Sequence, residues 1–338
     1  MSVDAKELAA MRQDFHRHPE LGFQEERTKA KVAQVLRDLG LDVHEGAGVV
    51  GVLRCGSGNR AIGLRADMDA LPILEKSNHD HVSRNEGVMH ACGHDGHTTM
   101  LLGAAKALVA DRGFDGTVVL LFQPNEEHGL GARAMIDEGV LERFPVEEVY
   151  AVHNFPGTPL GQVTTRHGLI CSSESLFEIH VHGQGGHASM PQVGRDAITI
   201  GAEIVQALQT IVARKLPPGA GAVVSVTEFL TDGQRNVLPG RATLKGDVRA
   251  RNPGDRDSIE ALMRQIAGGI AEAHGVTASV DFRTEFLETI NAEEPVEAVI
   301  RAARAAGLAM TADCQPMSFS EDFAPVSYTH LTLPTTSP

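Results

Sequence analysis

The segment Thr117-Val-Val-Leu-Leu-Phe122 carries no charge and is rich in apolar and β-branched residues, which predicts a β-strand. Other apolar segments before and after it also predict strands, and stretches with helical periodicity separate them. Strands that alternate with helices predict an α/β sheet with helices on its faces. A helical region at 8–39, which Gly40 would stop, precedes this sheet. The other strands are expected at 49–53, 61–65 and 148–153, and the helices at 98–110 and 131–138.

From about residue 174 the pattern changes to the order β-α-β-β-α-β, which is the signature of a ferredoxin-like unit. The unit is self-contained and about 110 residues long, within the usual size of a domain. We therefore expect an inserted domain at 171–285 and a first domain formed by 1–170 and 286–325. The elements of the insert are expected at 174–182, 196–213, 222–230, 242–250, 255–274 and 276–283, and a helix at 294–306 resumes the first domain.

Composition excludes several classes of protein. The 338 residues include 30 Lys and Arg against 44 Asp and Glu, so the net charge of -14 would repel the phosphates of a nucleic acid. No apolar run approaches the roughly 20 residues of a membrane span, and the N-terminus lacks the pattern of a signal peptide. Four cysteines are too few for a disulfide framework in a chain of this length. We expect a cytoplasmic protein with no nucleic-acid or membrane partner.

Side chains of the types that bind metals stand at four strand or loop ends of the first domain. In α/β sheets, active-site residues collect at the carboxyl ends of strands, so these side chains are expected to meet. A thiol, imidazoles and carboxylates suit a borderline-soft divalent ion, and a second carboxylate suits removal of a proton from water. Each feature alone has an ordinary structural explanation, such as a solvated Glu pair, but their coincidence predicts a metallohydrolase. The residues are Asp67, Asp69, Cys92, His94, Glu126, Glu127 and His153.

Two polar residues of the inserted domain are candidates for substrate contact. His187 lies on a Gly-rich loop, Gly183-Gln-Gly-Gly-His-Ala-Ser-Met-Pro191, directly after a predicted strand. Asn236, in Arg235-Asn-Val-Leu-Pro239, is a candidate amide donor, but Asn is also a common turn-forming residue. Both interpretations of Asn236 stay open at this point.

Seven motifs, in unbroken order from about residue 8 to residue 324, resemble one branch of the aminoacylase and carboxypeptidase family of two-metal peptidases. This branch contains hippurate hydrolases, N-acyl-amino-acid amidohydrolases and plant auxin-conjugate hydrolases. The motifs are His16-Arg-His-Pro-Glu-Leu-Gly-Phe23, Arg65-Ala-Asp-Met-Asp-Ala-Leu-Pro72, His90-Ala-Cys-Gly-His-Asp-Gly-His97, Gln123-Pro-Asn-Glu-Glu127, His153-Asn-Phe-Pro156, Gly186-His-Ala-Ser-Met-Pro191 and Ser320-Glu-Asp-Phe323.

The resemblance implies a two-metal catalytic domain and an inserted lid domain that also forms the interface of a homodimer. The implied cofactors are two divalent ions per chain, with Mn, Zn, Co and Ni all compatible with a shell that contains Cys. Asp67 stands where other branches of the family have a His ligand, so it is not expected to bind metal. The residues that match metal ligands are Cys92, His94, Glu127 and His153.

The resemblance also implies roles in catalysis. Glu126 matches the general base, and Asp69 matches a carboxylate that orients the site. His187 matches the lid residue that polarises the scissile carbonyl, with Asn236 as its helper. The implied reaction is hydrolysis of the amide bond of a small N-acyl or N-aroyl amino acid.

The sequence departs from the family at its C-terminal end. Family members continue past the Glu-Asp-Phe motif and supply a last His ligand, for which His330 is the sole candidate here. Residues 326–338 are rich in Thr and Pro without a helical period, so we interpret them as a non-native tail. The site for the two metal ions is therefore expected to lack one of its ligands. Two alternatives to the amidohydrolase follow: an inactive remnant that folds in part and dimerises, and a dipeptidase or carboxypeptidase of the same superfamily.

Overall fold

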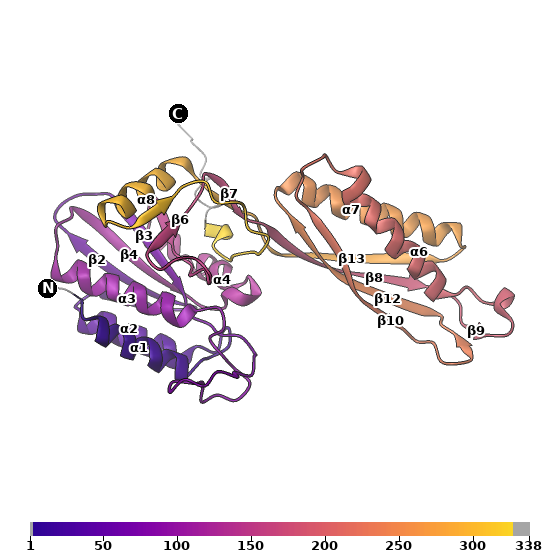
Figure 1. Cartoon of the computed structure of the whole chain (residues 1–338), viewed down its shortest axis with the longest axis horizontal. Helices are drawn as coiled ribbons and strands as arrows, with labels where there is room; N and C mark the ends of the chain where they lie inside the picture. Colours follow the sequence, from indigo (N-terminus) through magenta and orange to yellow (C-terminus); the bar gives the residue numbers. More distant parts are fainter. Residues whose placement is uncertain (1–2, 327–338) are drawn as a thin grey trace. The chain divides into compact units, whose positions relative to one another are not determined.

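A computed structural model describes residues 3–326, which divide into two compact units (Figure 1). The first unit comprises 3–165, 292–312 and 322–326, and the second comprises 166–291 and 313–321. The segment 313–321, expected in the first domain, clusters with the second unit because its backbone bonds to that unit. Met317 N donates to Ile170 O at 2.8 Å, and Ser172 N donates to Met317 O at 3.2 Å. Of the expected tail, all residues but Val326 lie outside the described range.

The first unit is built on a mixed five-stranded sheet in the order β1-β2-β4-β3-β5. Strand β3 runs parallel to β4 and β5, whereas β2 runs antiparallel to both of its neighbours. This arrangement confirms the α/β class predicted from the alternation of strands and helices. The strands are β1 (Asp42–Glu45), β2 (Val49–Cys55), β3 (Ala61–Asp67), β4 (Gly116–Gln123) and β5 (Glu148–Ala151).

Both faces of this sheet are covered, which explains the uninterrupted apolar run in β4. Val118, Leu120 and Phe122 pack in one core with the first three helices, while Val119 and Leu121 pack in a second core with α4 and α5. The alternation follows from the two-residue period of a strand. The helices of this unit are α1 (Ala5–Arg17), α2 (Glu26–Asp38), α3 (His94–Ala110), α4 (Gly131–Asp137), α5 (Val140–Arg143) and α8 (Glu293–Ala305).

The second unit contains an antiparallel sheet in the order β10-β12-β8-β13, with helices α6 and α7 packed on it. Along the chain the order is β8, α6, β10, β12, α7 and β13, which confirms the predicted β-α-β-β-α-β succession. These elements are β8 (Ser173–His182), α6 (Ala197–Thr210), β10 (Val223–Thr231), β12 (Arg241–Ala250), α7 (Pro253–Ala273) and β13 (Thr277–Phe286).

Short strands complete both units. In the first unit, β6 (Gln162–Thr164) pairs with β15 (Ala309–Thr311). In the second unit, β7 (Gly168–Cys171) pairs with β14 (Thr289–Asn291), and β9 (Gly186–His187) pairs with β11 (Val237–Leu238). Within residues 3–326, no helix combines the length and hydropathy needed to cross a bilayer.

Candidate active site

The predicted gathering of polar residues at strand ends takes place at the carboxyl edge of β3 and β4. The two strands are parallel and in register, so Asp67 at the end of β3 lies beside Gln123 at the end of β4. Asp69 follows β3 by two residues, and a 3-10 turn, Glu126–His128, follows β4. Because parallel neighbours end at the same edge, carboxylates distant in sequence converge there.

A turn at Gly93 positions His94 at the same edge of the sheet. The helix expected to begin at Thr98 begins four residues earlier, at His94, because Gly93 caps it in the left-handed region with φ of 97°. A Cβ at this position would lie 2.2 Å from Asn154 Oδ1, so only glycine fits. The early start buries the imidazoles of His94 and His97 in the first turn of α3.

The ring of His94 is fixed by hydrogen bonding on one side and faces carboxylates on the other. Its Nδ1 lies 3.3 Å from Asp69 Oδ1, and the other oxygen of Asp69 accepts the backbone N–H of Glu127 at 3.1 Å. A carboxylate at Nδ1 favours the tautomer with the proton there, which leaves the Nε2 lone pair for another partner. Nε2 lies 3.9 Å from single oxygens of Asp67, Glu126 and Glu127.

These residues fit a divalent metal ion. The Nε2 atom of His94 and the Oε1 atom of Glu127 are buried and have no hydrogen-bond partner within residues 3–326. A His nitrogen and a carboxylate oxygen bound to one ion can be at most about 4.3 Å apart, so the spacing of 3.9 Å allows a shared ion. Buried polar atoms without partners are costly, and a cation would satisfy both.

The remaining expected ligands stand at the edge of this cluster. Cys92 Sγ lies 3.4 Å from His153 Nε2, and the opposite ring nitrogen of His153 lies 2.7 Å from the Asn154 carbonyl. Single donor atoms of Cys92, His94 and His153 all lie within 4.8 Å of one another. A second set of candidate ligands thus shares His94 with the first. Burial raises the pKa of the Cys92 thiol in the ion-free chain.

The neighbouring carboxyl groups Asp67 and Glu127 have different pKa values because their surroundings differ. Burial raises the pKa of Glu127 to about 7, even though His94 acts in the opposite direction. Burial would also raise the pKa of Asp67, but His94, Arg65 and His97 together hold it well below its ordinary value. The two neighbouring carboxyl groups therefore differ in pKa, with that of Asp67 low and that of Glu127 near 7.

The catalytic candidate Glu126 is buried beside this cluster. Its Oε1 accepts the backbone N–H of Asp322 at 3.1 Å. Asp322, in turn, accepts Gln123 Nε2 at 2.7 Å and Ala132 N at 2.8 Å through one carboxylate oxygen. Asp322 thus lies at the strand edge of the first unit and holds Glu126 in place.

Asp67 and His97 make contacts in this cluster that the sequence did not indicate. Asp67 was not expected among the ligands, yet its oxygens lie 2.6 Å from His97 Nδ1 and 2.8 Å from Arg65 Nη1. His97 belongs to the motif His90–His97, for which the sequence indicates no role of its own; its other nitrogen accepts Asn154 N at 3.0 Å. Its spacing of three residues from His94 places both rings on one helix face, which was the available signal.

The two candidates of the second unit are neighbours within that unit. His187 on β9 lies opposite Val237 on β11, and Ala188 N donates to Asn236 O at 3.0 Å. The side chain of His187 is exposed, and its Nδ1 accepts Ser189 N at 3.2 Å, with the Ser189 hydroxyl 2.8 Å away. Accepting at Nδ1 leaves the Nε2 proton free to donate outward. Asn236 lies in the tight turn before β11, as its turn-forming interpretation predicted.

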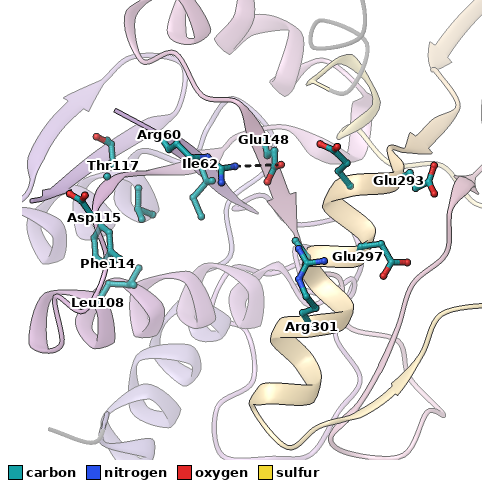
Figure 2. A pocket seen from close by; sticks show the side chains of 14 residues that line it. Arg60, Ile62, Leu108, Phe114, Asp115, Thr117, Glu148, Glu293, Glu297 and Arg301 are labelled. Atoms are coloured by element: carbon teal, nitrogen blue, oxygen red, sulfur yellow. Dashed lines mark ion pairs between the residues drawn. The ribbon is translucent and has the colours of Figure 1, made fainter. Parts of the chain in front are cut away.

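A cavity of about 910 Å³ lies at the opposite, amino-terminal ends of β3, β4 and β5 (Figure 2). Arg60, Ile62 and Glu148 line it together with acidic residues of α8, among them Glu293 and Glu297. It contains no candidate ligand or catalytic residue. Catalytic groups of α/β sheets belong at the carboxyl ends of strands, so chemistry and not cavity size locates the site.

Comparison with known proteins agrees with this geometry. Hippurate hydrolase of Campylobacter jejuni subsp. jejuni is 40% identical over 94% of this chain and 84% of its own length. Thermostable carboxypeptidase 2 of Saccharolobus solfataricus is 36% identical over 95% of this chain and 84% of its own. The Bacillus subtilis YXEP protein, described as a dinuclear metal binding peptidase, superposes with a TM-score of 0.83 at 32% identity, covering 96% of this chain and 86% of that one.

The family model described as peptidase family M20/M25/M40 matches residues 63–335, most of the chain. The match spans every candidate ligand and both candidates of the second unit. Together with the buried His–carboxylate cluster, it establishes that the chain belongs to peptidase family M20/M25/M40 and hydrolyses amide bonds.

Proposed function

We propose that the protein is a metal-dependent amidohydrolase that cleaves N-acyl and N-aroyl amino acids, using the residues around His94 as its catalytic centre. The observation that carries this proposal is the buried Nε2 atom of His94, which faces three carboxylate oxygens at 3.9 Å. The similarity to a hippurate hydrolase supports the substrate class, since hippurate is benzoyl-glycine.

Cys92, His94, Glu127 and His153 would hold two divalent ions. When bound, such ions supply Lewis acidity toward a carbonyl oxygen and toward water. The donor set of thiolate, imidazole and carboxylate is compatible with Zn, Mn, Co or Ni. Asp69 orients His94 through Nδ1, so that the lone pair on Nε2 points at the carboxylates.

Glu126 would act as the general base. Its carboxylate is buried, held by Asp322 N and placed 3.9 Å from the same His94 nitrogen as Glu127. In this role it takes the proton of the attacking water and passes it to the amine that leaves. His187 would donate its Nε2 proton to the substrate carbonyl, with Asn236 as a helper; the acceptor bond at its Nδ1 supports this tautomer.

A carboxypeptidase activity is the second candidate, because a thermostable carboxypeptidase covers almost the same length of this chain. A substrate panel separates the two. The first proposal predicts turnover of benzoyl-glycine and acetyl amino acids well above that of unblocked dipeptides. The opposite preference would favour the peptidase.

The metal requirement is tested on the same protein. Chelator-treated protein should lose turnover and regain it with one of the four ions, while elemental analysis counts the ions per chain. About two ions per chain would favour the enzyme, whereas none or one ion together with no turnover would contradict the proposal and favour the inactive remnant.

We also propose a homodimer formed through the second unit. Strand β10 is an edge strand and exposes Val223, Phe229 and Leu230. Exposed apolar edges favour pairing with another chain. Light scattering should give twice the chain mass, and Phe229→Lys should return it to one chain. The cytoplasmic location stays a prediction from the sequence.

A further inference from the structure

A second group of histidines and a carboxylate lies in the first unit, apart from the donors around His94. Its members come from the last turn of α1, which carries His16, and from the loop 71–91, which carries Glu75, His79 and His81. The loop contains no helix or named strand and runs directly into Cys92.

Three donor atoms of this group converge. Glu75 Oε1 lies 3.2 Å from His16 Nε2 and also 3.2 Å from His79 Nε2. One donor atom from each of the three residues lies within 4.8 Å of the other two. The other carboxylate oxygen of Glu75 accepts Ser83 N at 2.6 Å, so the carboxylate is held in this orientation.

Two protonation states of His16 fit these contacts: an imidazolium that donates to both Asp95 and Glu75, and a neutral ring. In the neutral ring, Asp95 Oδ2 at 2.9 Å favours a proton on Nδ1 and leaves a lone pair on Nε2 facing Glu75, where an ion can bind. The Ser77 hydroxyl contacts both Glu75 and His79 Nε2 but has one proton to give.

The geometry resembles the donor set of a zinc site. Donors bound at about 2.0–2.1 Å in a tetrahedral arrangement lie about 3.3 Å apart, close to the two contacts of 3.2 Å made by Glu75. Two imidazoles and one carboxylate suit zinc and similar ions. The bond from His16 to Asp95, itself supported by Arg12 Nε at 3.1 Å, is the carboxylate contact that metal-bound histidines make.

We propose that His16, Glu75 and His79 bind a divalent transition-metal ion of the zinc class, separate from the ions around His94. The ion joins the end of α1 to the loop 71–91 and thereby fixes the segment that leads to Cys92. The competing occupant is a proton shared between His16 and Glu75, and the experiment separates the two.

The experiment uses the full chain loaded with the ions of the His94 cluster and then titrated with zinc against a chromogenic chelator. Wild-type protein should bind one ion more per chain than Glu75→Gln or His79→Ala. Loss of a ligand should weaken that ion at least about tenfold, because even residues that merely support ligands contribute that much. His81→Ala is the matched control, since His81 stacks on His79 with ring centroids 3.8 Å apart but supplies none of the three donors.

Proteolysis provides a readout independent of turnover. Lys76 and Arg84 are exposed in the loop 71–91, so trypsin reports how firmly the loop is held. Zinc should slow cleavage at these sites in wild type and His81→Ala, and leave it unchanged in Glu75→Gln. Glu75→Gln preserves the shape of the side chain, and thermal unfolding verifies its fold. Equal zinc stoichiometry in wild type and both ligand variants, or zinc-independent cleavage in wild type, would overturn the proposal in favour of the shared proton.

Discussion

The two units of the chain differ in what they bury. The sheet of the second unit packs on α6 and α7 through apolar side chains such as Phe177, Ile179 and Leu244. The first unit also has an apolar core on each face of its sheet, but in addition it buries many ionisable groups. These are His16, Glu25, Arg65, Asp67, Asp69, His90, His94, Asp95, His97, Glu126 and Asp322.

This difference indicates that the second unit contributes mainly to stability, whereas the first unit also contains the groups suited to catalysis. A buried ionisable group lowers stability unless it is paired, and sites of chemistry commonly violate the rules that stabilise a core. Substitutions in the polar cluster of the first unit should therefore change activity far more than stability. Substitutions in the apolar core of the second unit should do the reverse.

The largest effect is expected at Glu126. Glu126→Gln should lower kcat for benzoyl-glycine by about 10²–10⁴-fold, the usual contribution of a general base. Metal content should stay the same, and thermal stability should not fall, since the amide still accepts Asp322 N. Glu142→Gln, an exposed change on α5, is the control. A variant with wild-type kcat would remove Glu126 from the mechanism.

Phe177 tests the prediction that a change in the apolar core of the second unit affects stability more than activity. Phe177→Ala should lower the free energy of unfolding by about 3–5 kcal/mol, because the ring is buried and the core would keep a cavity. Phe177→Leu should cost much less. Denaturant unfolding measures both, and kcat per folded chain should stay within a few-fold of wild type. A large loss of kcat in a fully folded Phe177→Ala chain would contradict the division between the units.

His187 is expected to be an exception to this division. It is a proposed catalytic group, but it lies on the unit that otherwise contributes mainly to stability. His187→Ala should lower kcat by about 10²–10³-fold, the usual effect of losing a donor to a developing oxyanion. KM should rise much less, because the contact strengthens in the transition state. His182→Ala, an exposed histidine at the end of β8, is the control. A pure KM effect would reassign His187 to substrate binding.

The smallest effect concerns Glu25 in the ion-free chain. Burial raises the pKa of Glu25 to about 7, although its carboxylate accepts Asn125 N at 2.8 Å. The unfolded chain releases this proton near pH 4.3, so the folded chain holds more protons between about pH 4.3 and 7. Stability should therefore fall as pH rises through this window, by at most about 3.7 kcal/mol. Glu25→Gln should flatten that part of the unfolding curve; an unchanged slope would exclude Glu25 as its source.

Much of the fold was predictable because hydrophobic periodicity is a local signal. The apolar run of β4 and the order of elements in the second unit follow from it directly. The meeting of Glu126, Glu127 and His94 was also predictable, since strand ends of an α/β sheet converge.

The remainder depends on contacts without a local signal. The start of α3 at His94 depends on the space that Asn154 leaves beside Gly93, from a distant segment. The clustering of 313–321 with the second unit rests on backbone hydrogen bonds of Met317, which any residue but proline could make. Asp67 belongs to the site through its contact with His97. This contact forms only when α3 and β3 have packed together.

The bond from Asp322 to Glu126 has a consequence for the order of folding. Asp322 joins Gln123, Glu126 and Ala132 across about two hundred residues of chain. Contacts of such long sequence separation form late, because the intervening chain must first lose its freedom. During synthesis the second unit can acquire much of its own structure before this contact forms. Glu126 therefore gains its hydrogen bond from Asp322 N only after the chain has been synthesised through residue 322.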